Sequence, residues 1–77
     1  MMETFNHNLP TLFKQLGLPH SQIAIAEFCA THELPDDTAL ADASFWNPAQ
    51  AQFIRDAWQQ DADWIPEIDR LAARLRH

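Results

Sequence analysis

Several residue types are rare in or missing from this 77-residue chain, and each shortage excludes a class of protein. Valine and tyrosine are absent, whereas alanine occurs twelve times, which favours helices because β-branched residues fit a pleated sheet better. The single glycine, Gly17, leaves no glycine-rich loop to hold a nucleotide phosphate. The single cysteine, Cys29, cannot form an internal disulfide, so a secreted disulfide scaffold is excluded.

Basic residues and long apolar runs are scarce as well. Five Lys and Arg stand against eleven Asp and Glu, and the net charge of −6 opposes binding to nucleic-acid phosphates and to anionic membrane surfaces. The longest apolar runs, of about four residues, are too short for a membrane span or for the apolar part of a signal peptide. We therefore expect a cytoplasmic protein that binds neither nucleic acid nor membranes.

Apolar residues recur with helical spacing in four segments, and they alternate, as strands require, nowhere for long. We therefore predict a single all-α domain over residues 1–77, a small orthogonal bundle of about four helices. The expected helices cover about residues 9–16, about residues 22–31, the stretch from Pro48 to a break at 61–63, and a last stretch that begins at about Ala62 or Trp64 and ends at Arg76.

Local start and stop signals delimit these segments. Asn8 and Ser21 are suitable N-caps for the first two helices, and Gly17 suits the left-handed position after the first. Asn47 and Gln50 have the spacing of a capping box at the start of the third. The second helix has additional apolar residues, which predict that it is covered on more than one side: Ile23, Ala24, Ala26 and Ala30.

Residues 33–46 form the least regular stretch of the chain. Pro35 prevents a simple continuation of the second helix, and four Asp and Glu side chains follow one another closely. We expect an ordered acidic loop between the second and third helices, with a short helical turn over 38–43 capped by Asp37. The apolar side chains expected to point inward are Leu34, Leu40, Phe45 and Trp46.

Three strings of this sequence, taken together, resemble a known family. They are LFKQLGLP (12–19), ALADASFWNPAQAQF (39–53) and DADW (61–64). The chain is similar, from about Leu9 to Leu75, to small bacterial proteins grouped as domain of unknown function 2789. The resemblance implies an all-helical bacterial protein of the cytoplasm, and it implies no activity, cofactor or catalytic residue.

Side chains with catalytic or metal-binding chemistry are present but scattered. Cys29 and His32 lie three positions apart, yet a zinc site needs two such pairs, so we predict no metal site. The acids lie where helix caps and loops favour acids, and we predict no catalytic residue and no cofactor. The first two helices resemble a helix-turn-helix in outline, but the second offers only Gln22 near its start for base edges.

Three tryptophans and one wide apolar stripe indicate a protein-interaction role. Core packing accounts for two of the tryptophans, and we expect Trp58 or Trp64 to contact a partner. In the fourth helix Trp64, Ile68, Leu71 and Leu75 form the stripe, and its acidic first half and basic last turns match an antiparallel second copy. The alternative is that this stripe packs against the first three helices.

The sequence therefore predicts a small cytoplasmic protein-interaction module. Its partner would be an unknown protein or a second copy in a homodimer, contacted by Trp58, Trp64 and Ile68. The alternative is a small enzyme or regulatory subunit with a cleft of acidic and histidine side chains. A deep pocket joining His32 to the acidic loop would favour the enzyme, and a shallow apolar patch around a tryptophan would favour the interaction module.

Overall fold

Four α-helices and two short 3₁₀ turns follow one another along residues 8–76, the part of the chain that the computed structural model describes. The helices are α1 (Leu9–Gln15), α2 (Gln22–Thr31), α3 (Pro48–Gln60) and α4 (Ile65–Leu75). The 3₁₀ turns are η1 (Leu40–Asp42), between α2 and α3, and η2 (Ala62–Trp64), which leads directly into α4. No β-strand occurs within residues 8–76, so the all-α prediction is confirmed.

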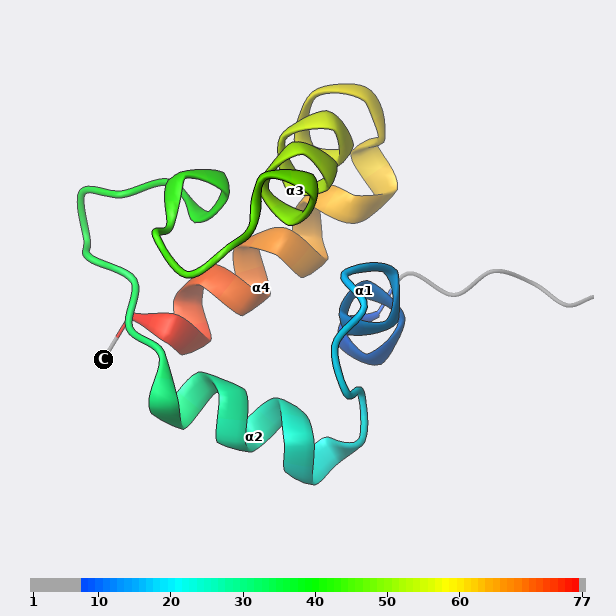
Figure 1. The fold of residues 1–77 in the computed structure, drawn as a ribbon. Helices are drawn as coiled ribbons and strands as arrows, with labels where there is room; N and C mark the ends of the chain where they lie inside the picture. The colour runs from blue at the N-terminus through cyan, green and yellow to red at the C-terminus, as the bar shows by residue number, and fades with distance from the viewer. Residues whose placement is uncertain (1–7, 77) are drawn as a thin grey trace, which may run out of the picture.

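Helix α4 crosses the middle of the molecule and contacts each of the other three α-helices (Figure 1). Helix α3 lies on one side of it and α2 on the other, while α1 packs against both α2 and α4. The helices cross at steep angles, since α1 is seen end-on in Figure 1 whereas α2 and α4 run across the view.

The predicted capping residues start the helices as expected. The Asn8 carboxamide oxygen accepts from the backbone N–H of Thr11 at 2.9 Å, and Ser21 Oγ accepts from that of Ala24 at 3.1 Å. At α3 the capping box is complete, because Asn47 accepts from the Gln50 N–H at 2.8 Å and the Gln50 side chain accepts from the Asn47 N–H at 3.0 Å. Each bond satisfies a backbone donor that the first turn leaves unpaired.

Gly17 ends α1 in the left-handed conformation that the sequence predicts, with φ at +74°. The Leu18 N–H then donates to the Phe13 carbonyl at 2.9 Å, and the Gly17 N–H donates to the Lys14 carbonyl at 3.0 Å. This pair of bonds is a Schellman motif, which reverses the chain sharply after a helix. The motif turns the chain back toward α2.

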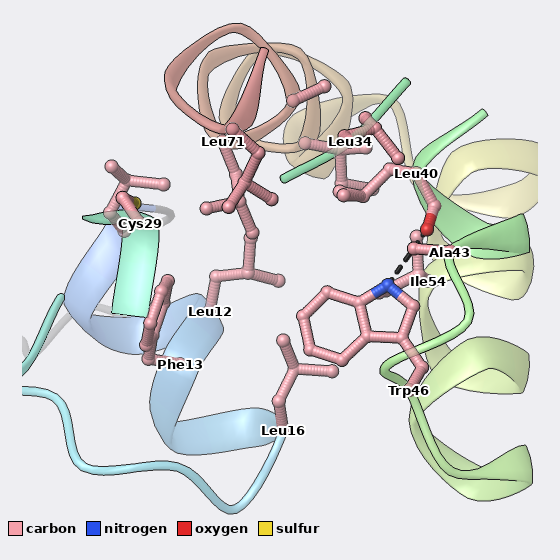
Figure 2. Packing of buried hydrophobic residues seen from close by; sticks show 14 of the residues in the cluster. Leu12, Phe13, Leu16, Cys29, Leu34, Leu40, Ala43, Trp46, Ile54 and Leu71 are labelled. Carbon is pink, nitrogen blue, oxygen red and sulfur yellow. Dashed lines mark hydrogen bonds between the residues drawn. The ribbon is translucent and has the colours of Figure 1, made fainter. Parts of the chain in front are cut away.

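One hydrophobic core joins side chains from all four α-helices and from the segment between α2 and α3. In Figure 2 side chains of α1 and α4 converge with Leu34 and Trp46, which come from that segment. Leu34, Leu40 and Trp46 are buried and Phe45 is half-buried against them, so the predicted inward positions are confirmed. The largest fully buried side chains are Phe13, Leu12, Leu34, Ile54, Leu71 and Leu75.

Two long-range hydrogen bonds fix how the segments meet. The Leu34 N–H donates to the carbonyl of Leu75 at 2.8 Å, which joins the segment after α2 to the end of α4. The Gln50 Nε2 donates to the carbonyl of Leu16 at 2.9 Å, which joins the start of α3 to the end of α1. Both bonds satisfy helix-terminal carbonyls that lack a partner within their own helix.

Two local expectations are wrong. Asp37 does not cap the turn after it: η1 begins behind Ala39 without a side-chain cap, and the Asp37 carboxylate accepts from the Thr38 hydroxyl at 3.3 Å instead. Helix α2 is also not covered on a second side, because Ile23 is 74% exposed and Ala26 and Ala30 are exposed with it. The reason is that α1 and α4 pack on the same side of α2.

A candidate binding groove beside Trp58

A groove of about 380 Å³ lies between η1, α3 and α4. Four buried apolar side chains, Leu40, Ile54, Ile68 and Ala72, contribute to its lining. We call it the Trp58 groove; the exposed or half-buried residues that also line it are Ala39, Ala41, Asp42, Arg55, Trp58, Gln59, Asp69 and Arg76.

Trp58 is the one tryptophan of the three that reaches the surface. Its side chain is 45% exposed, whereas Trp46 and Trp64 are only 8% and 4% exposed. On α3, Ile54 and Ala57 are buried in the core, and Trp58 follows them at the edge of that buried face. Trp58 and Ile23 are the only large apolar side chains exposed within residues 8–76.

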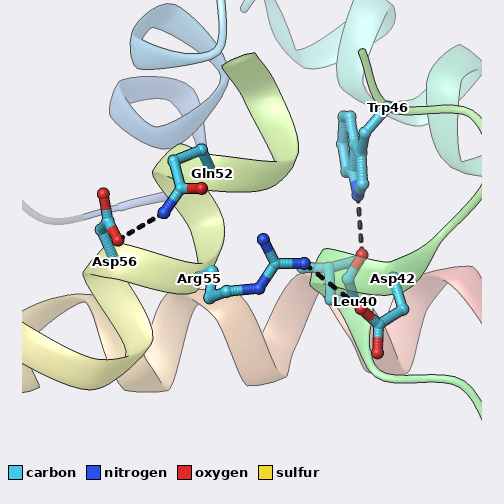
Figure 3. Close-up of polar contacts among 6 residues, drawn as sticks. All are labelled: Leu40, Asp42, Trp46, Gln52, Arg55 and Asp56. Carbon is cyan, nitrogen blue, oxygen red and sulfur yellow. Dashed lines mark hydrogen bonds and ion pairs between the residues drawn. The ribbon is translucent and has the colours of Figure 1, made fainter. Parts of the chain in front are cut away.

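Three of the four charged side chains that line the groove already have partners in the chain. Figure 3 shows one such contact, between Arg55 and Asp42. Arg55 pairs with Asp42 at 3.4 Å, in a contact whose side chains are 44% and 65% exposed and which therefore contributes little stability. Arg76 donates to the carbonyl of Thr38 at 2.9 Å. Asp69 is exposed, and its carboxylate has no hydrogen-bonding or ion-pair partner among residues 8–76.

Trp46 fixes the position of Leu40, one of the buried residues that line the groove. Its indole N–H donates to the Leu40 carbonyl at 2.8 Å in a buried hydrogen bond (Figures 2 and 3). The indole also stacks on Phe28 with ring centres 5.6 Å apart and meets Phe45 edge-on at 4.8 Å. The turn η1 is thereby fixed against the aromatic core, and Leu40 is positioned in the groove.

His32 belongs to this aromatic cluster and not to the groove. Its ring stacks on Phe28 with centres 4.0 Å apart, and its Nδ1 forms a hydrogen bond with the Phe28 carbonyl at 2.9 Å. Of the residues in the range 8–76, no histidine lines the groove, and Asp42 is the single acid of residues 33–46 that does. The Trp58 groove is therefore not the pocket joining His32 to the acidic loop that would favour an enzyme.

The lone cysteine lies in the core, away from the groove. Cys29 is 7% exposed, and burial raises the pKa of its thiol above the usual value, while the nearby Arg74 charge acts in the opposite direction. A thiol in this state is a poor nucleophile. Within residues 8–76 no three His, Cys, Asp or Glu side chains are grouped so that they could hold a metal ion.

The three predicted partner contacts lie in different environments. Trp58 and Ile68 both line the groove, but Trp58 is exposed whereas Ile68 is only 3% exposed. Trp64 is buried, and its ring meets that of Phe53 edge-on with ring centres 6.1 Å apart. Leu71 and Leu75 are fully buried, so the α4 stripe packs within the chain, as the alternative in the sequence analysis described.

Sequence reasoning missed the rest of the groove. Arg55 lies three positions before Trp58 and four before Gln59 on α3, so this spacing could have indicated that Arg55 neighbours both. The contribution of Asp69 and Arg76 depends on how α4 crosses α3, for which the sequence has no local signal.

Comparisons with known proteins agree with this fold. The family model described as "Protein of unknown function (DUF2789)" matches residues 2–75. The solution NMR structure of protein CV0237 from Chromobacterium violaceum is similar, with a TM-score of 0.80 and 48% sequence identity, over 97% of this chain and 95% of that one. The comparison with curated proteins gives no match.

Within residues 8–76, no helix has the length and apolar character needed to cross a membrane.

Proposed function

We propose that this chain, which belongs to the DUF2789 family of proteins of unknown function, is a small protein-interaction module. Its binding site is the Trp58 groove, in which an apolar side chain of a partner protein packs against the exposed indole. The observation that carries the proposal is that the most exposed tryptophan lines a groove with a buried apolar floor. Tryptophan is enriched among the residues that dominate binding energy at protein interfaces.

The chemistry of the groove supports binding over catalysis. Among residues 8–76, no histidine, cysteine, serine or threonine lines it, so the only side chains there that could act as a nucleophile or general base are Asp42 and Asp69. One of its two carboxylates, Asp42, is paired with Arg55. Leu40, Ile54 and Ile68 instead offer an apolar surface suited to an apolar side chain.

The distribution of exposed apolar residues supports a partner segment over a second copy. Stable dimers bury about 1,200–2,000 Å² in total, with an apolar centre. Within the described residues 8–76, the two large exposed apolar side chains, Trp58 and Ile23, lie on separate helices, α3 and α2. A short segment that inserts into one groove needs no such broad face.

A cytoplasmic location is part of this proposal, supported by the lone cysteine, since small secreted domains commonly depend on several disulfides.

The experiment begins with site-specific photo-crosslinking in cells of the source organism. A benzophenone amino acid is placed at Gln59, which lines the groove, and in a matched control at Lys14, which is exposed on α1 outside it. A protein captured from Gln59 and not from Lys14 is then purified and titrated against variants of this chain.

Trp58→Ala should weaken that complex by about thirtyfold or more, which is the usual effect of truncating a central interface tryptophan. Ile23→Ala is the matched control, because it removes the other large exposed apolar side chain and should change the affinity by less than about twofold. Circular dichroism should show that both variants keep their helices. Equal affinities of wild type and Trp58→Ala, or no protein crosslinked from Gln59, would contradict the proposal.

A further inference from the structure

Four charged side chains line the Trp58 groove, and they differ in whether another group of the same chain forms a hydrogen bond or ion pair with them. Both arginines are engaged, Arg55 by the Asp42 carboxylate and Arg76 by the Thr38 carbonyl. Asp69 is the groove-lining charge that has no hydrogen bond or ion pair with any residue of the described range 8–76. The two arginines and two aspartates that line the groove sum to a formal charge of zero, and Asp69 is the one of the four whose charged group has no partner within the described range.

Asp69 also lacks the roles that ordinarily explain an acid on a helix. It is the fifth residue of α4, beyond the first turn, where a negative charge would be stabilised by the helix dipole. The residues three and four positions away on either side are Ile65, Pro66, Ala72 and Ala73, none of which is basic. By contrast, Asp61 caps η2, and Glu67 pairs with Arg70.

An exposed tryptophan and an unengaged carboxylate on opposite helices of one groove form a site suited to a cation. The face of an indole attracts Arg and Lys side chains, and a carboxylate supplies the charged hydrogen-bond acceptor. The buried apolar residues Leu40, Ile54 and Ile68, which form the floor of the groove, favour a ligand that carries an apolar group beside its cation. The net charge of −6 adds long-range attraction for a basic segment and repels an acidic one.

We infer that the partner segment held by the Trp58 groove is basic: a peptide with a Lys or Arg next to an apolar residue. The apolar side chain lies over Leu40, Ile54 and Ile68, and the cation lies between Trp58 and Asp69. This inference rests on the proposed function and adds to it the charge of the partner.

Selection from a library of random dodecapeptides displayed on phage tests the inference with the purified chain. Peptides that bind are expected to be enriched in Lys or Arg next to Leu, Ile, Phe or Met. An enriched peptide is then synthesised and titrated against protein labelled with 5-fluorotryptophan, in which the ¹⁹F resonance of Trp58 is assigned by its loss in Trp58→Phe. Binding in the groove should shift that resonance more than those of the buried Trp46 and Trp64.

Two variants with the same change in net charge separate the local effect from the global one. Asp69→Asn should weaken the peptide about tenfold, and Glu27→Gln, on the exposed face of α2 outside the groove, should change affinity by less than about twofold. Asp69→Lys should reverse the selection, enriching acidic peptides. Binding to the wild-type chain should also weaken as the salt concentration rises.

The outcomes distinguish this inference from the proposed function. Peptides that shift the Trp58 resonance but contain no basic residue would overturn the inference and leave the proposed function standing. Equal losses in Asp69→Asn and Glu27→Gln would also overturn it, since they would show an effect of net charge alone. If no selected peptide shifts the Trp58 resonance, or if the chain instead forms a dimer that shifts it, both are overturned.

Discussion

Replacing Trp46 with phenylalanine tests how the buried indole supports the fold and the groove. Trp46 is 8% exposed, and its N–H donates to the Leu40 carbonyl at 2.8 Å. A phenyl ring fills much of the same space but has no donor. The Leu40 carbonyl would keep one partner, the N–H of Ala43 at 3.1 Å, so it would not be left wholly unpaired.

The expected loss of stability follows from these two changes. Losing a hydrogen bond to an oxygen that keeps a second partner costs about 1 kcal/mol. Phenylalanine also lacks two of the ring carbons of tryptophan, and burying each stabilises the fold by about 0.8 kcal/mol. Trp46→Phe should therefore lower the free energy of unfolding by about 2.5 kcal/mol, which in a domain of this size lowers the melting temperature by about 10–20 °C.

Urea unfolding followed by circular dichroism measures this loss, and Trp58→Phe is the matched control. The control makes the same chemical change at a side chain that is 45% exposed, so it should alter stability by no more than about 0.5 kcal/mol. A benzothienylalanine at position 46 keeps the ring size but replaces the N–H with sulfur, and it should lose only the hydrogen-bond part, about 1 kcal/mol. Coincident unfolding midpoints for Trp46→Phe and Trp58→Phe would refute the reasoning.

The remaining predictions concern helix capping and the buried thiol. Asn47→Ala should destabilise the chain by about 1–2 kcal/mol in urea unfolding, and Ser21→Ala by less, because Asn47 belongs to a reciprocal capping box whereas Ser21 accepts one bond; equal losses would contradict this. Burial raises the pKa of the Cys29 thiol, so above its usual value of 9.0 the unfolded chain loses the proton before the native one does. The free energy of unfolding should then fall as pH rises from about 7 to about 10, and it should fall less in Cys29→Ala; parallel profiles for the two proteins would count against it.

Much of the fold can be read from local sequence signals, because helix starts depend on nearby residues. Ser21 and Asn47 cap α2 and α3 through backbone groups three residues away, and the bounds of α2 match the prediction. Gly17 ends α1 for a similarly local reason, since glycine readily adopts a positive φ.

The candidate site was less predictable, because it depends on how the helices cross. Trp58 and Trp64 both follow apolar helical spacing in the sequence, yet one is exposed and the other is buried. The 3₁₀ turn η2 between α3 and α4 contains Trp64, and its three residues per turn change the direction of that side chain relative to a continuous α-helix. Only the packing of α4 across α3 brings Asp69 to the groove that Trp58 lines.

The central position of α4 has a consequence for how the chain folds during synthesis. The helix made last is the one that contacts all three others, and the Leu34 N–H finds its acceptor at Leu75, forty-one residues further along. Helices α1, α2 and α3 are thus synthesised before α4, so side chains that are buried in the folded chain, such as Leu12 and Ile54, cannot complete their packing until α4 is available. We expect the nascent chain to remain without a stable core until α4 emerges, and then to fold as one cooperative unit.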